Sequence, residues 1–401
     1  RCCTQNGVRG GNATVHFPIW HPEIEDILVL KNNKGTEDNR VRRMDYSIQI
    51  SKLFYERFMN EEEITLISPH MAPGLYEAFG TEEFDDLYLK YEADKTIPKK
   101  KVSAQDLFFD LLKERAETGR IYIMNLDHCN SHSSFKDKVS MSNLCQEITL
   151  PTTPIQHVDD EQGEIALCIL SAVNVGGLND LSELENICDL SVRALEQIID
   201  YQDYPVKAAE VSTKKRRSLG IGYIGLAHYL AKNGVKYSDP KAWEIVDRLS
   251  EAFQYHLLRA SCDIAKEKGK CEGFERTKYA DGLLPIDHYK KDVDGIVPHK
   301  QRMAWESLRK DIAKHGLRHS TLSAQMPSES SSVVSNETNG IEPPRALLSI
   351  KKSKKGPLKQ IAPGYPKLKN DYTLLWDMPN NEGYINVVAM MQKYFDQAIS
   401  G

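Results

Sequence analysis

Two stretches of the chain repeat apolar residues at the spacing of an amphipathic helix. In residues 181–205 the apolar positions recur every three to four residues, and Ser182 and Glu185 have the spacing of a capping box at the start. A second such pattern covers residues 243–268, and Gly269 supplies a C-terminal stop. We predict a helix over each stretch. Their predicted buried positions are Leu184, Ile187, Cys188, Val192, Leu195, Ile198 and Ile199, and then Ile245, Val246, Leu249, Phe253, Leu257 and Ile264.

Two shorter runs favour β-strands. Arg120–Asn125 is rich in β-forming residues, and Ile165–Ser171 is apolar at nearly every position. The second run is typical of a strand buried inside a parallel sheet, and it places Cys168 on a core strand. Because strand and helix patterns alternate along the chain, we predict an α/β architecture.

Several motifs can be explained either by local structure alone or by a function. Gly220–Gly225 matches the GxGxxG dinucleotide pattern, but no apolar strand precedes it, so small residues under a tightly packed helix explain it better. Gly7–Gly11 indicates a mobile loop, with an anion site as the alternative. Lys351–Pro357 indicates a solvated basic turn rather than a polyanion patch. Asp127–His132 is short of the usual four-ligand zinc set, so we predict no metal there.

The overall composition is that of an ordinary globular protein, with 401 residues, 40% of them hydrophobic and 27% charged. No stretch approaches the roughly 20 apolar residues of a membrane span. The net charge of -5 does not supply the positive field of duplex-binding proteins. We therefore expect neither a membrane nor a nucleic acid as partner. The eight cysteines lack paired spacing, which favours a reducing compartment, and we predict a cytoplasmic location.

Asn143, Cys145 and Glu147 stand two residues apart in the run Ser142–Pro151. Alternate side chains of an extended backbone share a face, about 6.6 Å apart. An extended backbone would therefore turn an amide, a thiol and a carboxylate to one side, where they could bracket one small molecule. Cys145 taken alone would be a buried structural cysteine. Its two neighbours favour an active site.

Pro327–Val334 has proline and serines immediately ahead of an apolar run, which predicts the start of a helix. Free amides and the helix dipole at such a position attract phosphate, and the serine hydroxyls would add donors. A plain capping segment explains the same residues equally well. The local sequence leaves both interpretations open.

Taken together, Ser142–Glu147, Ala166–Cys168 and Pro327–Ser331 resemble the catalytic subunit of class I ribonucleotide reductase. The resemblance covers essentially the whole chain. Further matching motifs are Asn6–Gly11, Asp127–Asn130, Tyr201–Pro205, Leu219–Gly222 and Asn339–Arg345.

The resemblance implies a fold and a domain organisation. The family has a ten-stranded α/β barrel made of two half-barrels, with a finger loop that carries the radical cysteine to its centre. This implies a first half-barrel at residues 1–140, with a specificity loop at 1–13, a finger loop at 141–152, and a second half-barrel at 153–401.

The resemblance also implies roles for the three closely spaced residues. Cys145 would become a thiyl radical and take the hydrogen from the ribose 3′ carbon. Glu147 would act as the base on the 3′ hydroxyl, and Asn143 would hydrogen-bond the sugar hydroxyls. These roles fit the chemistry of the groups, because a thiol has a weak S–H bond and a carboxylate can move a proton from about 3 Å away.

Other residues match the family's further sites. Cys168 matches one member of the redox pair that reduces the 2′ position, and Leu170, on the same face of the predicted strand, would help to wall the pocket. Gln5 and Arg9 lie in what matches the specificity loop, which relays the bound effector to the substrate base. The residues that match the segment holding the substrate diphosphate are Ser328, Glu329, Ser330 and Ser331.

The partners and cofactors follow from the same resemblance. The chain would bind no cofactor directly, and its radical would come from a metal cofactor in a small subunit. Thioredoxin or glutaredoxin would serve as reductant, deoxynucleoside triphosphates and ATP as allosteric effectors, and the complete large subunit would be a homodimer. The other redox cysteine and the ATP-cone region would lie before Arg1, and the tyrosine pair and the shuttle cysteines beyond Gly401.

Three hypotheses follow. The first is a portion of the large subunit of ribonucleoside-diphosphate reductase, active once the missing segments and the small subunit are supplied. The second is a catalytically incomplete fragment that acts only as a nucleotide-binding or assembly piece. The third is a glycyl-radical enzyme of similar barrel fold, although these 401 residues contain no visible C-terminal glycine-radical motif.

Overall fold

The computed structural model describes residues 4–5, 9–353 and 356–400, and the chain divides into two compact units. Unit 1 comprises residues 1–131 and 138–149, and unit 2 comprises residues 132–137 and 150–401. Each unit contains its own cluster of buried apolar side chains. The half-barrel boundaries at residues 140 and 153 stay a prediction.

Unit 1 is built on a parallel sheet in the order β3 (Thr14–Pro18), β4 (Asp45–Ile50) and β7 (Ile121–Asn125). The strand predicted at 120–125 is confirmed as β7. Because side chains alternate across a strand, the sheet has two different faces. The remaining elements of unit 1 are β1 (Thr4–Gln5), β2 (Arg9–Gly10), α1 (Ile24–Val29), α2 (Lys52–Met59), β5 (Glu63–Ile67), α3 (Leu75–Ala78), α4 (Phe84–Ala93), β6 (Lys99–Ser103), α5 (Ala104–Thr118) and α6 (Leu126–His132).

One face of this sheet is apolar and the other carries polar side chains. Ile48 and Ile50 of β4 and Ile121 of β7 belong to the buried cluster of unit 1. The opposite face presents Thr14 and His16 from β3, with Ser47 and Gln49 beside them on β4. Burial of the apolar face fixes the sheet on the core of unit 1. The polar side chains of the other face can hydrogen-bond to another segment of the chain.

Unit 2 also contains parallel strands, with β8 (Leu170–Asn174) paired to β9 (Gly220–Ile224). Backbone hydrogen bonds continue this arrangement beyond the two strands. Ile221 pairs in parallel with Ser323, and Gln325 pairs in parallel with Ile399. Segments near residues 323 and 399 therefore extend the sheet next to β9, as an α/β fold requires.

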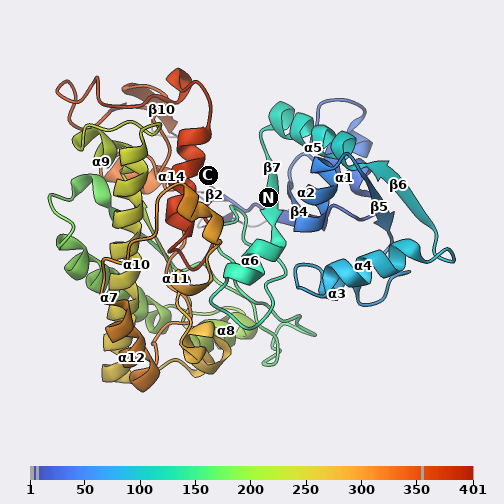
Figure 1. Cartoon of the computed structure of the whole chain (residues 1–401), viewed down its shortest axis with the longest axis horizontal. Helices are drawn as coiled ribbons and strands as arrows, with labels where there is room; N and C mark the ends of the chain where they lie inside the picture. Colours follow the sequence, from blue (N-terminus) through green and yellow to red (C-terminus); the bar gives the residue numbers. More distant parts are fainter. Residues whose placement is uncertain (1–3, 6–8, 354–355, 401) are drawn as a thin grey trace. The chain divides into compact units, whose positions relative to one another are not determined.

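Helices cover this sheet. The longest, α10 (Pro240–Lys268), contacts α7 (Glu183–Tyr201), α12 (Trp305–His315) and α14 (Glu382–Gln392), and it runs among them in Figure 1. Both long helices predicted from the sequence are thus confirmed, and Gly269 ends α10 at φ +84°. The other helices and strands of unit 2 are α8 (Lys207–Arg216), α9 (Leu226–Lys232), α11 (Pro285–His288), α13 (Glu329–Val334), β10 (Leu348–Ser353) and β11 (Gly356–Ile361). Short 3-10 turns lie at Glu37–Asn39, Val175–Gly177, Glu272–Arg276, Lys278–Asp281, Lys291–Gly295 and Leu375–Asp377.

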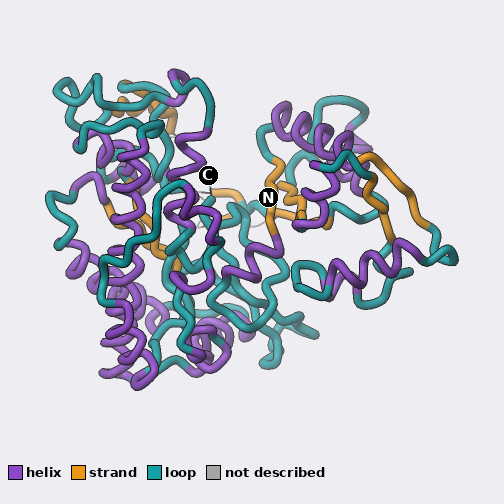
Figure 2. Tube along the Cα trace, viewed as in Figure 1, coloured by secondary structure: helices purple, strands orange, loops and turns teal. Residues whose placement is uncertain are grey.

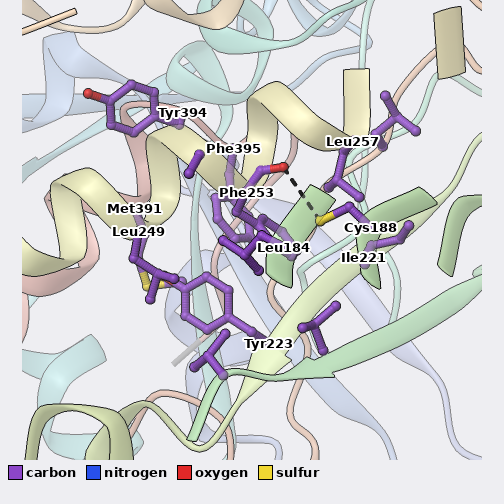
Figure 3. Packing of buried hydrophobic residues seen from close by; sticks show 14 of the residues in the cluster. Leu184, Cys188, Ile221, Tyr223, Leu249, Phe253, Leu257, Met391, Tyr394 and Phe395 are labelled. Carbon is purple, nitrogen blue, oxygen red and sulfur yellow. Dashed lines mark hydrogen bonds between the residues drawn. The ribbon is translucent and has the colours of Figure 1, made fainter. Parts of the chain in front are cut away.

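The core of unit 2 forms where α7 and α10 meet β9. Figure 3 shows Cys188 of α7 among Leu184, Ile221 and Phe253, with its Sγ directed at the Phe253 carbonyl oxygen 3.9 Å away. The Cys188 side chain is fully buried, as its place on the apolar face predicted. Burial raises the pKa of this thiol, so Cys188 is a structural residue.

Four local predictions need correction. Ser182 occupies the N-cap position of α7 but makes no side-chain cap hydrogen bond, so the predicted capping box is wrong. The glycine-rich run was predicted to lie under a tightly packed helix, but residues 220–224 form strand β9. A Cβ at Gly222 would lie 2.6 Å from the Ala324 carbonyl oxygen, so this glycine lets two neighbouring backbones approach. The basic turn predicted at 351–357 also needs correction, because Lys351 and Lys352 lie in β10 and Gly356 and Pro357 begin β11, while residues 354–355 lie outside the described residues.

The fourth correction concerns the strand predicted at residues 165–171. Strand β8 begins only at Leu170, and Cys168 precedes it with an exposed side chain. The partner strand β9 begins at Gly220, because the residues shortly before it form helix α8. Residues 165–168 therefore have no ladder to join. Apolar composition predicted burial here, but strand pairing decides where the strand starts.

Candidate functional site

The segment from residue 133 to residue 169 contains neither a helix nor a strand longer than a single bridge, and in Figure 2 such segments appear as loop. Asn143, Cys145 and Glu147 lie in its first part, within unit 1. The backbone there is a turn, in which the Gln146 amide donates to the Asn143 carbonyl oxygen at 3.3 Å. Gln146 has φ +73°, in the left-handed region. The predicted extended backbone is therefore wrong.

The turn is closed by two side chains of its first arm, which bind the backbone of Ile148 on the second arm. The Ser142 hydroxyl donates to the Ile148 carbonyl oxygen at 2.6 Å, and the Ile148 amide donates to Asn143 Oδ1 at 3.2 Å. Both backbone polar groups of the buried Ile148 are thus satisfied, which explains how residues 142–148 hold a compact shape. We call residues 142–148 the Cys145 loop. Cys145 stands at its turn.

Glu147, the acidic residue of the Cys145 loop, has 3% of its surface exposed. Burial raises the pKa of its carboxyl, and hydrogen bonds from its own backbone amide and from the Asn143 side chain partly oppose that effect. Among the described residues, its Oε2 has no hydrogen-bond partner. A buried carboxylate with one free oxygen and a raised pKa has the properties of a general base.

Tyr122 of β7 also belongs to this site. Tyr122 pairs with Ser47 of β4, so its side chain lies on the same polar face of the sheet as His16. Burial raises the pKa of its phenol, and nearby acidic groups raise it further. Its hydroxyl stays protonated near neutral pH and can donate a hydrogen bond. Tyr122 was not predicted as part of the site, because no local pattern links β7 to a loop that follows it only after α6.

Three further residues were missed. Gln49 Nε2 donates to the Ser140 carbonyl oxygen at 2.7 Å, His16 Nε2 lies 2.9 Å from the Ser142 carbonyl oxygen, and Thr14 Oγ1 donates to the Leu144 carbonyl oxygen at 3.2 Å. We call Thr14, His16 and Gln49 the anchoring residues. The strict alternation of polar and apolar positions in β4 was the signal that could have indicated such a face.

The proposed reductant and pocket residues lie in unit 2. Cys168 is exposed just before β8, and Leu170 is the half-buried first residue of that strand. The predicted place of Cys168 on a core strand is therefore wrong, and its role as a reductant stays a prediction.

The predicted helix start at residues 327–334 is confirmed as α13. Ser328 holds the N-cap position, is buried, and donates from its hydroxyl to the Met326 carbonyl oxygen at 2.9 Å. Glu329, Ser330 and Ser331 are exposed on the first turn. Their role towards a phosphate stays a prediction.

The remaining predicted sites lie near the start of the chain or concern metals. Gln5 and Arg9 pair in the antiparallel β1–β2 ribbon, while residues 6–8 of the predicted mobile loop lie outside the described residues. Asp127–His132 forms most of α6. Across residues 4–5, 9–353 and 356–400, no group of three or more His, Cys, Asp or Glu side chains could hold a metal ion. Nor does any helix of these ranges have the length and apolarity needed to cross a membrane.

Comparison with known proteins identifies the family of the chain. The family model described as "Ribonucleotide reductase, barrel domain" matches residues 1–401, which confirms the predicted α/β barrel class. The ribonucleoside-diphosphate reductase subunit alpha of Haemophilus influenzae is 58% identical over 405 residues, covering 100% of this chain and 54% of that protein.

Two further relatives carry the same type of name. The ribonucleoside-diphosphate reductase 1 subunit alpha of Escherichia coli is 55% identical, covering 100% of this chain and 53% of that protein. The subunit alpha of phage T4 is 43% identical over 410 residues, covering 100% of this chain and 54% of that protein. The chain therefore spans about half the length of the curated relatives that it matches.

Proposed function

Because the chain belongs to the ribonucleotide reductase barrel-domain family, we propose that it forms part of the catalytic subunit of a ribonucleoside-diphosphate reductase. That enzyme would reduce ribonucleoside diphosphates to 2′-deoxyribonucleoside diphosphates by a thiyl-radical mechanism and so supply DNA precursors. The observation that carries the proposal is the Cys145 loop, which combines an amide, a thiol and a buried carboxylate with one oxygen unpaired.

Cys145 would start the reaction. As a thiyl radical its sulfur takes a hydrogen atom from the ribose 3′ carbon, which breaks a C–H bond and forms an S–H bond. Glu147 accepts the 3′ hydroxyl proton, while Asn143 hydrogen-bonds the sugar hydroxyls and holds the ring in position. Because Cys145 must be a radical again after each cycle, the hydrogen atom returns to the 3′ carbon at the end.

Cys168 would supply reducing power at the 2′ carbon. The 2′ hydroxyl leaves as water, and the two electrons that replace it come from a pair of thiols, which end as a disulfide. Cys168 provides one thiol, and the second comes from the rest of the subunit. Thioredoxin or glutaredoxin would reduce the disulfide again, for which the exposed position of Cys168 is suitable.

Three further groups of residues would act on the substrate. Ser328, Glu329, Ser330 and Ser331 lie at the start of α13, where backbone amides and hydroxyls can bind the diphosphate. Leu170 would form part of the pocket wall. Gln5 and Arg9 would relay the identity of a bound effector, a deoxynucleoside triphosphate, to the substrate base.

The proposal also includes a partner subunit, an oligomeric state and a location. A small subunit with a metal cofactor would supply the radical that reaches Cys145. The complete large subunit would form a homodimer, bind ATP as a further effector, and work in the cytoplasm. The alternative of a nucleotide-binding or assembly piece without turnover is not favoured, because the three residues of the Cys145 loop are all present and the relatives carry the names of reductase subunits.

The experiment that tests this function is reconstitution. The complete large subunit containing this chain is mixed with the radical-generating small subunit, a dithiol reductant, an effector and one ribonucleoside diphosphate. We expect the 2′-deoxy diphosphate to accumulate over many turnovers, as measured by chromatography of the products. Nucleotide binding without any deoxynucleotide would instead support the assembly piece.

Replacement of Cys168 by alanine separates the reductant from the radical site. In the reconstituted enzyme, Cys168→Ala should lower multiple turnover driven by a small dithiol by about 10²-fold or more, because the disulfide can no longer form. Radical events at Cys145 should persist. The matched control is Cys262→Ala, which removes a buried cysteine of the same unit and should keep its turnover. Unchanged multiple turnover in Cys168→Ala would contradict the assigned role.

A further inference from the structure

The first arm of the Cys145 loop and the residues just before it are held at alternate positions by the polar face of the unit 1 sheet. The three contacts are made to the carbonyl oxygens of Ser140, Ser142 and Leu144, at 2.7, 2.9 and 3.2 Å. Ser140 and Ser142 lie just before the turn and Leu144 at its start, and the carbonyl oxygens of these alternate residues meet one row of donors. The last of them immediately precedes Cys145.

The donors come from adjacent, registered strands. Thr14 and His16 are two residues apart on β3, and Gln49 on β4 pairs with Pro18 at the next position of the same row. Since these strands pack on the buried cluster of unit 1 with their other face, the row of donors is rigid. A rigid row can define the position of a loop that has no secondary structure of its own.

His16 is the central member of this row. Burial lowers the pKa of its imidazole, so the ring is neutral near pH 7, and the ring nitrogen facing the Ser142 carbonyl oxygen carries the hydrogen. Within the described residues, its Nδ1 is buried without a hydrogen-bond partner, as is the Oγ of the neighbouring Ser47. The Ser142 contact is therefore the hydrogen bond that fixes the orientation of the ring.

We propose that His16 is a positioning residue, which with Thr14 and Gln49 sets the register of the Cys145 loop and so the place of the Cys145 sulfur. A slip of one residue along this face would move Cys145 by about 3.3 Å. Catalytic groups need placement to well within that distance, and an error of about 1 Å can cost about 100-fold in rate. This inference rests on the proposed function of Cys145.

The test uses the complete large subunit reconstituted with its small subunit. His16→Phe keeps a ring of similar size but removes the donor, and His16→Gln restores an N–H donor. For His16→Phe we expect kcat to fall by about 10-fold to 100-fold with KM within about twofold, because substrate binding does not need the sulfur. His16→Gln should recover most of the lost kcat.

An isotope effect separates positioning from simple loss of folded enzyme. A ribonucleoside diphosphate with deuterium at the 3′ carbon should slow His16→Phe more than it slows the wild type, because a misplaced sulfur makes hydrogen transfer more rate-limiting. A smaller amount of correctly folded enzyme would lower kcat without changing this ratio. His21→Phe is the matched control, since His21 lies just after β3 and its Nδ1 accepts from the nearby Glu23 amide, which is outside the Cys145 loop. It should behave as the wild type.

Several outcomes would overturn the inference. They are a kcat of His16→Phe within twofold of the wild type, an equal loss in His16→Phe and His16→Gln, or an unchanged isotope effect. If His16→Phe does not fold, Thr14→Val removes the adjacent donor at nearly constant shape, and normal turnover in that variant would have the same meaning. Cys145→Ala is assayed in parallel. Turnover in Cys145→Ala contradicts the proposed function, whereas an inactive Cys145→Ala beside a normal His16→Phe contradicts only this inference.

Discussion

Cys145→Ala in the complete, reconstituted enzyme is expected to lower kcat by at least about 10⁴-fold, a loss of the size seen when a catalytic nucleophile is removed. Alanine has no weak S–H bond, so no side chain remains that can carry the radical to the substrate. Binding of the ribonucleoside diphosphate should change little, because the substrate is held by other residues. Turnover is measured as deoxynucleotide formed per enzyme, and binding by titration of the substrate.

The matched control for this variant is Cys188→Ala. Cys188 is fully buried between α7 and α10, and its substitution leaves a small cavity. We expect a loss of about 1 kcal/mol in the free energy of unfolding and a normal kcat. Normal turnover in Cys145→Ala would show that the loop does not carry the radical.

Glu147→Gln is expected to lower kcat by about 10²-fold to 10⁴-fold, the contribution of a well-placed general base. The amide keeps the shape of the side chain and can still occupy its buried site, so the fold should be retained. Glu114→Gln is a suitable control, because Glu114 of α5 is buried in the same unit and also has an oxygen without a partner among the described residues. That variant should keep the wild-type kcat.

The pH dependence gives a second readout for Glu147. A base acts in its ionised form, so the rate should fall as the pH falls through the pKa of the carboxyl. Burial raises that pKa, and the acid limb of the wild-type profile should therefore lie above the pH expected for an ordinary glutamate. The limb should vanish in Glu147→Gln. If it stays in the variant at the same pH, another group titrates and Glu147 is not the base.

The long helices and the α/β class could be predicted from the sequence because they depend on many residues at once. The apolar positions of α7 and α10 recur over several turns, so single exceptions such as the exposed Ile198 do not hide the pattern. The strand start at Leu170 could not be predicted in this way. It depends on where β9 begins, and an isolated apolar run carries no information about its partner.

The candidate site was found from its residue types, but its geometry was not. The positive φ of Gln146 turns the chain at a residue that is not glycine, which no local pattern indicates. The contacts of Thr14 and His16 with the loop join residues more than 120 positions apart, so they depend on the tertiary fold. The roles of Asn143, Cys145 and Glu147 in turn came from the resemblance to a family and not from their spacing.

The central claim is that Cys145 takes the hydrogen atom from the 3′ carbon of a ribonucleotide and returns it. The most direct measurement is competition between a ribonucleoside diphosphate with deuterium at the 3′ carbon and the unlabelled substrate in the reconstituted enzyme. The account predicts that the unlabelled substrate is consumed faster and that the deuterated product keeps its label at the 3′ carbon. Equal consumption of the two substrates, or loss of the label to water, would contradict it.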